Sequence, residues 1–249
     1  MKIVADTHCH TIASTHAYST IMENVNEASK KGLYAIAITD HANNMPGSPG
    51  PFYYENLRVI PKNINGVYVL KGIEANVIDY NGNIDVSDDI ISKLDWVIAS
   101  MHGPTLNSPK SIDECTTAWL NIARNPYVKV IGHCGSPIYK FDYEKVIPEF
   151  GKNNKLVEIN NATFRIRKDY IPNCKEIALL CKKYRVSVII NSDSHFCTQI
   201  GNVDLALSML REIDFPEDLI INADKDRFKE YINNNTTFLS QNQTQNTFF

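Results

Sequence analysis

Short runs of apolar and β-branched residues recur along this chain and are separated by longer amphipathic stretches. The runs are Ile3–Ala5, Tyr34–Thr39, Val67–Ile73, Asp95–Ser100, Val128–Ile131, Leu156–Ile159 and Val186–Ile190. Continuous apolar runs of this length are typical of parallel strands that are buried on both faces. The pattern therefore predicts seven parallel strands.

Amphipathic helical patterns lie between these runs. They cover Thr20–Lys31, Ser111–Arg124, Cys174–Tyr184 and Val203–Glu212. Gly32 fits a helix stop, and Ser111 with Glu114 fits a capping box. Strands that alternate with helices favour an α/β fold of parallel βα units, and seven such strands in 249 residues predict a closed or nearly closed barrel. An open, doubly wound sheet is the alternative.

The chain is expected to form one domain over residues 1–233. From 234 to 249 the sequence is rich in Asn, Gln and Thr, which predicts a polar and poorly ordered tail.

Lys and Arg total 25 and Asp and Glu total 28, a formal charge of −3. This balance lacks the excess of positive charge that would indicate nonspecific binding to nucleic acid. The N-terminus has no signal-like apolar region, and no apolar run approaches the roughly 18–20 residues of a membrane helix. We expect a cytoplasmic protein and leave homo-oligomers open.

The six cysteines show no paired spacing that would indicate a disulfide framework. Reduced, partly buried thiols are the expectation. Only Cys134, which directly follows His133, is kept as a remote ligand candidate.

All seven histidines stand beside the predicted strands, and most have a carboxylate nearby. They are His8, His10, His16, His41, His102, His133 and His195. Because side chains alternate along a strand, His8 and His10 share a face and can hold one ion together. Neutral imidazole is the commonest metal ligand in proteins. The distribution points to a metal site that is assembled from many strand ends.

Two carboxylates complete this candidate site. Glu74 ends the third strand, and Asp193 ends the seventh, on the same face as His195. The sixth strand alone has no candidate ligand at its end. In parallel barrels the C-terminal strand ends surround one mouth, where active sites form. Seven imidazoles and two carboxylates exceed the needs of one catalytic zinc and suit two or three ions of zinc, manganese or iron.

These residues resemble the ordered motifs of the PHP (polymerase and histidinol phosphatase) superfamily. The matching motifs are Asp6-Thr7-His8-Cys9-His10, Thr39-Asp40-His41, Glu74, His102, His133 and Asp193-Ser194-His195. The segments Ser14–Thr20 and Gly72–Asn76 are similar to those of its small stand-alone phosphatase branch. The resemblance spans residues 3 to 212 and implies a distorted, TIM-like (β/α)7 barrel with a trinuclear site at the C-terminal strand ends.

The resemblance also implies how the ligands are divided among three divalent ions. One ion would be held by His8, His10, Glu74 and Asp193, and a second by Glu74, His102 and His133, so that Glu74 bridges the two. The third would be held by His16, His41 and His195. All nine positions carry the expected residue types.

The implied activity is a metal-dependent phosphoesterase, most simply a phosphomonoesterase that acts on a small phosphorylated substrate. Metal binding lowers the pKa of water to about 7, which supplies a hydroxide nucleophile without a Ser or Cys. Asp6 and Asp40 are expected to orient imidazoles through their second nitrogen, with a proton shuttle as a further role for Asp40. Arg167, then Arg165 and Lys168, are the candidates for a phosphate clamp. The Pro- and Gly-rich segment Asn43–Tyr54 is expected to overhang the mouth.

Two other classes of function stay open. One is an amidohydrolase-type C–N hydrolase, although no lysine follows a strand end to serve as a carboxylated ligand. The other is a noncatalytic metal-binding or regulatory module. Within the phosphoesterases, a proofreading-type exonuclease is disfavoured because the chain has no polymerase region and its balanced charge predicts no basic face.

Overall fold

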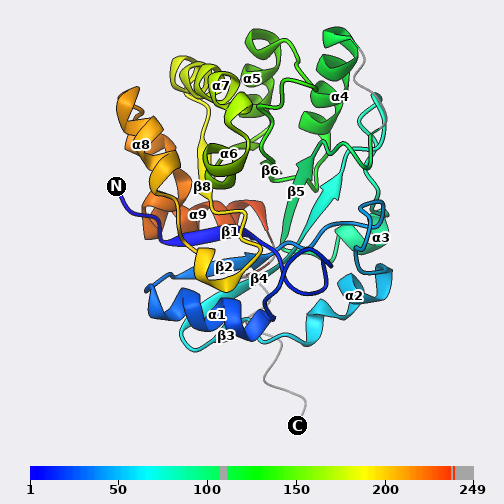
Figure 1. The fold of residues 1–249 in the computed structure, drawn as a ribbon, viewed down its shortest axis with the longest axis vertical. Helices are drawn as coiled ribbons and strands as arrows, with labels where there is room; N and C mark the ends of the chain where they lie inside the picture. The colour runs from blue at the N-terminus through cyan, green and yellow to red at the C-terminus, as the bar shows by residue number, and fades with distance from the viewer. Residues whose placement is uncertain (107–110, 237, 239–249) are drawn as a thin grey trace.

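A parallel sheet forms the centre of the molecule in this computed structural model, which describes residues 1–106, 111–236 and 238 (Figure 1). Its strands, in spatial order, are β1 (Ala5–Cys9), β2 (Ala35–Ile38), β4 (Val67–Asn76), β5 (Trp96–Ser100), β6 (Val130–Ile131), β7 (Leu156–Asn160) and β8 (Val188–Asn191). The short β3 (Asn63–Ile64) pairs antiparallel with β4 as an extra hairpin strand. The predicted seven parallel strands and α/β fold are confirmed.

The sheet closes almost completely into a barrel, because β8 returns to β1. At the C-terminal ends, Cys9 and Ser194 form a parallel bridge, and the His10 amide donates to the Ser194 carbonyl at 2.9 Å. At the other end the gap is filled by Asn222. Its side-chain amide donates to the carbonyls of Ala5 at 2.8 Å and Ile190 at 2.6 Å. The prediction of a nearly closed barrel therefore holds.

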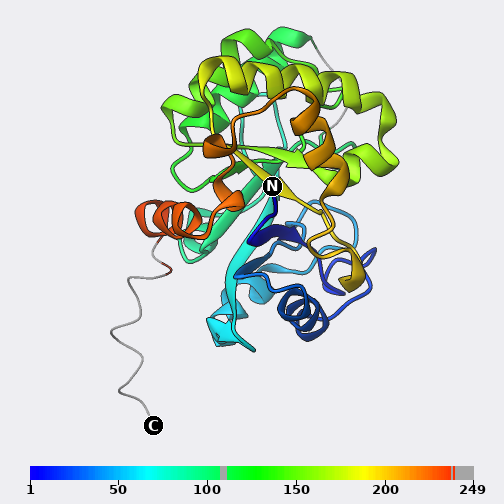
Figure 2. The ribbon, with the colours of Figure 1, turned by 90° about the vertical axis from the view of Figure 1, so that its left-hand side faces the viewer.

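Helices surround the barrel, with α4, α5 and α7 on one side and α1 and α2 on the opposite side (Figures 1 and 2). The helices are α1 (Ile21–Lys30), α2 (Pro51–Asn56), α3 (Asp88–Ile91), α4 (Ile112–Arg124), α5 (Tyr143–Lys152), α6 (Asn161–Ile166), α7 (Ile171–Tyr184), α8 (Asp204–Glu212) and α9 (Lys225–Asn235). The predicted capping box opens α4: Ser111 Oγ accepts from the Glu114 amide, and the Glu114 carboxylate accepts from the Ser111 amide. The box fixes the first turn of α4.

Small and large apolar side chains fill the barrel at the N-terminal ends of the strands. Ala35 and Ala37 leave room for Trp96, and all three are fully buried. Phe228 of α9 packs against the same cluster, so that α9 covers the N-terminal ends of the strands. Because this end of the barrel is plugged by apolar side chains, polar groups gather at the opposite end.

Two differences between the predicted and observed strand boundaries affect the site. Strand β1 continues to Cys9 and β4 continues to Asn76, so His8 and Glu74 lie inside strands rather than after them. The expected domain boundary at 233 falls inside α9, and Phe238 is buried, with its ring 6.0 Å from that of Tyr68. Of the predicted tail, residues 237 and 239–249 lie outside the described residues.

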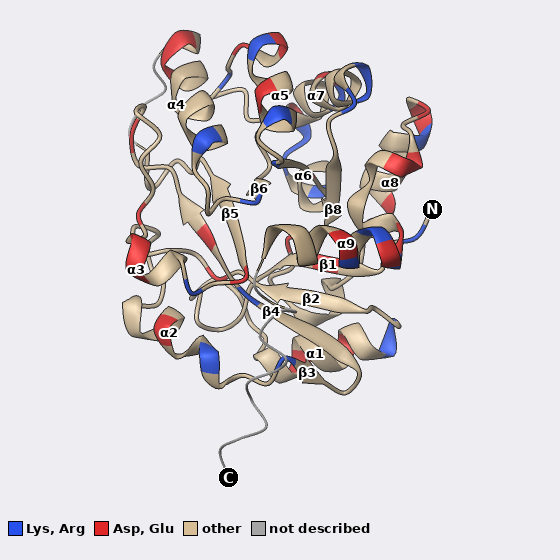
Figure 3. Cartoon of the chain, turned by 180° about the vertical axis from the view of Figure 1, so that it is seen from behind, with Lys and Arg blue, Asp and Glu red and all other residues tan. Residues whose placement is uncertain are grey.

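Acidic and basic residues both occur along the outer helices α4, α5, α7 and α8 (Figure 3). This mixture agrees with the near balance of acidic and basic residues in the sequence. Within the described part of the chain, no helix has both the length and the apolar character needed to cross a membrane.

Candidate metal centre at the barrel mouth

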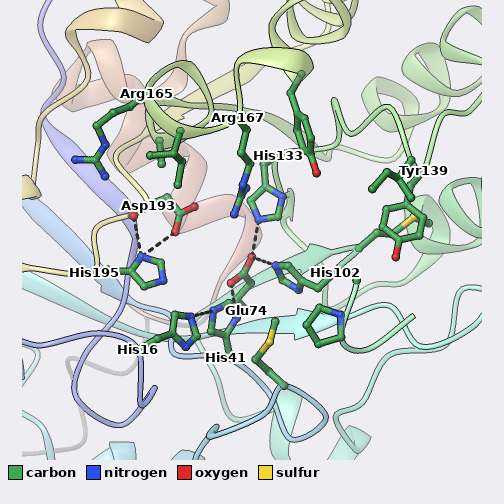
Figure 4. A pocket seen from close by; sticks show the side chains of 18 of the residues that line it. His16, His41, Glu74, His102, His133, Tyr139, Arg165, Arg167, Asp193 and His195 are labelled. Atoms are coloured by element: carbon green, nitrogen blue, oxygen red, sulfur yellow. Dashed lines mark hydrogen bonds and ion pairs between the residues drawn. The ribbon is translucent and has the colours of Figure 1, made fainter. Parts of the chain in front are cut away.

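The predicted ligands converge at the C-terminal end of the barrel, where they line or underlie a cavity of about 570 Å³. His16, His41, Glu74, His102, His133, Asp193 and His195 line it (Figure 4). His8 and His10 are fully buried directly beneath this layer. All nine residues predicted from the sequence are therefore brought together.

Glu74 lies at the centre, and each of its oxygens faces a different group of imidazoles. Oε2 is 3.4 Å from His8 Nε2, 3.5 Å from His10 Nε2 and 2.8 Å from His41 Nδ1. Oε1 is 3.3 Å from His102 Nε2 and 3.0 Å from His133 Nε2. This is the arrangement that a carboxylate bridging two ions would have.

Asp193 completes the group around His8 and His10. Its Oδ1 lies 3.6 Å from His8 Nε2 and 3.3 Å from His10 Nε2. Its Oδ2 accepts a hydrogen bond from Asn160 Nδ2 at 3.1 Å, which fixes the carboxylate plane. Three of the four side chains expected around the first ion, those of His8, His10 and Asp193, thus form one compact group of donor atoms, and Glu74 lies close to both histidines.

The side chains expected around the third ion are arranged differently. His16 Nε2 is 3.1 Å from His41 Nε2, and the ring centres of His16 and His195 are 5.0 Å apart. However, the compact group of donor atoms that contains His41 and His195 includes His10 rather than His16. Of the other compact groups found in the described part of the chain, one joins His8, His10 and Asp193 and the other joins His41, Glu74 and His102.

The two carboxylates are held in their charged form. Burial opposes ionisation of Glu74, yet the neighbouring imidazoles of His8, His102 and His41 hold its pKa well below the usual range. The pKa of Asp193 is likewise lowered by His8, His10 and His195 against the effect of burial. Charged carboxylates are the form in which these residues bind metal.

The pKa values of His10 and His8 are shifted in opposite directions. Burial and the neighbouring His41 hold the pKa of His10 well below its usual value, which favours the neutral form that binds metal. For His8, burial is outweighed by Glu158, Glu74 and Asp193, and its pKa is raised well above the usual value. The three carboxylates around His8 therefore create a local potential that attracts a cation.

Several buried donor atoms fit metal ions. His8 Nε2, His10 Nε2, His41 Nδ1 and Glu74 Oε2 are buried and form no hydrogen bond with the described residues. Buried polar atoms without a hydrogen bond are costly, so a bound cation is an expected partner for them. The distances of 3.3–3.6 Å between the donors of the first group match the roughly 3.4 Å between two ligands of a tetrahedral ion with bonds of about 2.1 Å.

The PHP domain family model matches residues 6–244. The chain belongs to the PHP domain family. This match confirms the resemblance that the histidine and carboxylate motifs suggested.

Known relatives of this PHP domain agree with that assignment. The chain is 46% identical over 234 residues to a protein from Clostridium botulinum named a probable phosphatase, covering 94% of this chain and 96% of that protein. A probable phosphatase from Acetivibrio thermocellus is 45% identical over 232 residues, 93% of this chain and 96% of the relative. These relatives and the family match support the predicted enzyme class, a hydrolase of phosphate esters.

Among solved structures, the fold is similar to that of the histidinol phosphate phosphatase of Lactococcus lactis, which was solved with zinc, L-histidinol and phosphate. The TM-score is 0.58 at 16% sequence identity, over 87% of this chain and 95% of the other. At this identity the likeness establishes the shared fold.

Glu158 of β7 supports the centre and was missed by the sequence analysis. Its Oε1 accepts from Asn191 Nδ2 at 2.9 Å and lies 2.7 Å from His8 Nδ1. Its Oε2 accepts from the His133 amide at 2.9 Å and from Asn160 Nδ2 at 3.1 Å. Glu158 therefore fixes the ring of His8 and the backbone of His133 at once, as the outer partner of a metal-binding histidine does.

A contact from Asn76, which is not a predicted ligand, fixes the ring of His102. Its Nδ1 lies 2.7 Å from Asn76 Oδ1, at the end of β4. Asn76 is itself held by Asp85, whose carboxylate accepts from the Asn76 amide at 2.8 Å and from Nδ2 at 2.7 Å. The chain of contacts from Asp85 through Asn76 aims His102 Nε2 at Glu74.

Asp6 and Asp40 anchor loops, and the contacts differ from the expected hydrogen bonds to imidazoles. Asp6 accepts from Ser192 Oγ at 2.5 Å and from the Gly201 amide at 2.7 Å. Asp40 accepts from the Thr11 amide and from Ser14 Oγ, each at 2.8 Å. Asp6 therefore holds the loop that carries Asp193 and His195, and Asp40 holds the loop that carries His16.

Two of the predicted ligands have unusual backbone conformations. His133 has φ 23° and Asp193 has φ 54°, in the left-handed region that non-glycine residues rarely adopt. Before His133, a Cβ at Gly132 would lie 2.1 Å from Ser100 Oγ, so only glycine fits there. Such strain is retained where the surrounding structure holds a functional geometry.

The basic residues after β7 separate into two groups. Arg165 and Arg167 line the cavity, whereas the exposed Lys168 does not. In Figure 4, Arg167 extends toward the ligands between Asp193 and His133, and Arg165 lies above His195. Of the proposed clamp residues, the structure thus brings the two arginines to the site.

The segment Asn43–Tyr54 contributes both to the cavity and to its support. Met45 lines the cavity. The last residues of the segment belong to α2, where Tyr53 donates to Asp40 Oδ2 at 2.6 Å and Tyr54 donates to the His41 carbonyl.

Cys134 is buried, and burial raises the pKa of its thiol well above the usual value. It belongs to none of the compact donor groups in the described residues.

Proposed function

We propose that this PHP domain is a metal-dependent phosphomonoesterase with three divalent ions at the barrel mouth. The observation that carries the proposal is the position of Glu74, with one oxygen toward His8 and His10 and the other toward His102 and His133. The ions would be zinc, manganese or iron, which suit a set rich in imidazoles.

The proposed ligand sets follow the family resemblance. His8, His10, Glu74 and Asp193 would hold one ion, and Glu74, His102 and His133 would hold the second. His16, His41 and His195 would hold the third; the distance of 3.1 Å between His16 Nε2 and His41 Nε2 is short enough for two ligands of one ion.

Such ions, when bound, lower the pKa of water to about 7 and neutralise charge on a phosphoryl group in an in-line displacement. The chain supplies the geometry for this chemistry. Glu158 and Asn76 hold His8 and His102 in place, so the donor atoms need little rearrangement. Arg167 would bind two phosphate oxygens, because its guanidinium forms paired hydrogen bonds with such groups.

Removal of divalent ions is expected to abolish phosphate release from small phosphomonoesters. The purified PHP domain, loaded with zinc or manganese, should release inorganic phosphate from at least one ester of a broad panel. Treatment with a chelator should reduce this rate to background, because the proposed ions supply the hydroxide nucleophile. Added metal should restore the rate. Activity that survives complete metal removal would contradict the proposed function.

Replacement of Arg167 by alanine is expected to raise KM for the ester by about 10-fold or more, because a charge-assisted hydrogen bond contributes about 1.5–3 kcal/mol. The matched control is Lys168→Ala, which removes a neighbouring cation that does not line the cavity. Steady-state kinetics on both variants measure the difference. An unchanged KM for the Arg167 variant would remove this residue from the phosphate site.

Two rival functions are separated by simple assays. A C–N hydrolase would release amine or carboxylate from amide substrates and leave phosphate esters intact. A noncatalytic module would bind metal without turnover on either panel. For an exonuclease, a labelled single-stranded DNA assay decides.

A further inference from the structure

Two chemically different sets of side chains line the cavity. One set consists of the histidines, Glu74, Asp193, Arg165 and Arg167. The other set, the apolar wall, consists of Met45, Met101, Pro104, Ile138, Tyr139 and Ile166. In Figure 4, Tyr139 lies on the far side of the cavity from Arg165, beyond His102. A substrate whose phosphate reaches the ligands therefore places the rest of its body against a mainly apolar wall.

Three polar side chains of the cavity already take part in hydrogen bonds within the protein. The Tyr139 hydroxyl donates to the Leu106 carbonyl at 2.9 Å. The Tyr170 hydroxyl accepts from Ser136 Oγ at 3.2 Å, and Gln199 Oε1 accepts from the His195 amide at 3.1 Å. A body with many hydroxyl groups would lose hydrogen bonds to water along the apolar wall, where the Tyr139 hydroxyl is the polar side-chain group and is already bonded, and this loss costs free energy.

The charges around the cavity also limit the substrate. Among the described lining residues, the carboxylates are Glu74 and Asp193, and both are used as proposed metal ligands. Arg165 and Arg167 add positive charge at the rim. A protonated amine on the substrate would therefore meet cations and no available carboxylate.

We infer that the natural substrates are phosphomonoesters of compact, uncharged and mainly apolar or aromatic alcohols. This inference rests on the proposed function and adds the class of alcohol to it. A cavity of about 570 Å³ accommodates a phosphate with a body of about the size of one aromatic ring and a short chain. Sugar phosphates and amine-bearing esters would bind less well.

Four esters test the inference on the metal-loaded, full-length protein. Benzyl phosphate, glycerol 3-phosphate, glucose 6-phosphate and O-phosphoethanolamine all release a primary alcohol, which keeps the leaving group similar. We expect kcat/KM for benzyl phosphate to exceed the other three by about 10-fold or more. Equal or faster hydrolysis of any of the other three would overturn the inference and leave the proposed function intact. Release of phosphate from none of the esters in this set or in the broad panel would overturn the proposed function itself.

A matched pair of variants locates the preference on the wall. Ile138 and Ile112 are similarly exposed, at 52% and 49%, but only Ile138 lines the cavity. Ile138→Gln is expected to lower kcat/KM for benzyl phosphate by about 5- to 10-fold and to change that for glycerol 3-phosphate much less. Ile112→Gln should change neither. An equal loss on both esters in the Ile138 variant would count against an apolar contact.

Discussion

Replacement of Glu74 by glutamine is expected to reduce kcat by about 1,000-fold and to remove metal from the protein. Loss of an outer partner of a metal ligand already costs about 10- to 100-fold, and a ligand shared by two ions should cost more. Glutamine keeps the size of the side chain but removes the charge. One of the two groups of imidazoles would then face an amide nitrogen, which is a donor and cannot bind a cation.

Measurement of metal content and of kcat on the same Glu74→Gln preparation tests this prediction. Glu55→Gln is the control, because Glu55 is exposed on α2 and does not line the mouth. A circular dichroism spectrum that matches the wild type would show that the barrel is intact. Retention of full metal content with a loss of activity below about 10-fold would contradict a bridging role for Glu74.

Replacement of Glu158 by glutamine is expected to weaken metal binding and activity by about 10- to 100-fold, although Glu158 is not a proposed ligand. Each of its oxygens lies within hydrogen-bonding distance of two nitrogen atoms. These are His8 Nδ1 and Asn191 Nδ2 at Oε1. At Oε2 they are the His133 amide and Asn160 Nδ2. In either orientation, the amide nitrogen of glutamine would face donors where an acceptor is required. His8 would also lose the nearest of the three carboxylates that raise its pKa.

The readout for Glu158→Gln is the metal dissociation constant, measured by competition with a chelator of known affinity. A residue that matters only for folding would lower thermal stability and leave the metal affinity of the folded fraction unchanged. Glu149→Gln, on the outer helix α5, is the control. A metal affinity within about twofold of the wild type would show that Glu158 does not position His8.

The convergence of the nine proposed ligands at one end of the barrel could be predicted from the sequence, because each follows a predicted parallel strand or lies near its end. His8 and His10 alternate with Cys9, and parallel strands bring His41, His102 and His133 to the same end of a barrel. The separation of the donors into groups could not be predicted in the same way. It depends on side-chain packing, which places His10 rather than His16 in the compact group with His41 and His195.

The supporting contacts were harder to predict. The run Leu156–Ile159 was interpreted as a buried strand without a ligand, although a carboxylate inside such a strand requires a partner. That signal could have identified Glu158. The loops anchored by Asp6 and Asp40 had no comparable signal. An irregularity in the pairing of β1 with β2 lies between Asp6 and Cys9, so simple alternation does not describe this part of the strand.

Contacts between distant parts of the chain were not predictable from local patterns. Asn222 closes the barrel by bonding to Ala5, 217 residues away in the sequence. The segment Asn43–Tyr54 was expected only to overhang the mouth, and its sequence did not indicate that the hydroxyls of Tyr53 and Tyr54 would reach Asp40 and the His41 carbonyl. Both features depend on how complete elements dock, which residue type alone does not specify.

The number of ions per chain tests the central claim most directly. The wild-type protein is stripped with a chelator, reconstituted with zinc or manganese, freed of excess metal and measured by mass spectrometry against protein concentration. Nine ligands in three sets predict about three ions per chain. A ratio of two or fewer under metal-saturated conditions would contradict a three-ion centre at the barrel mouth.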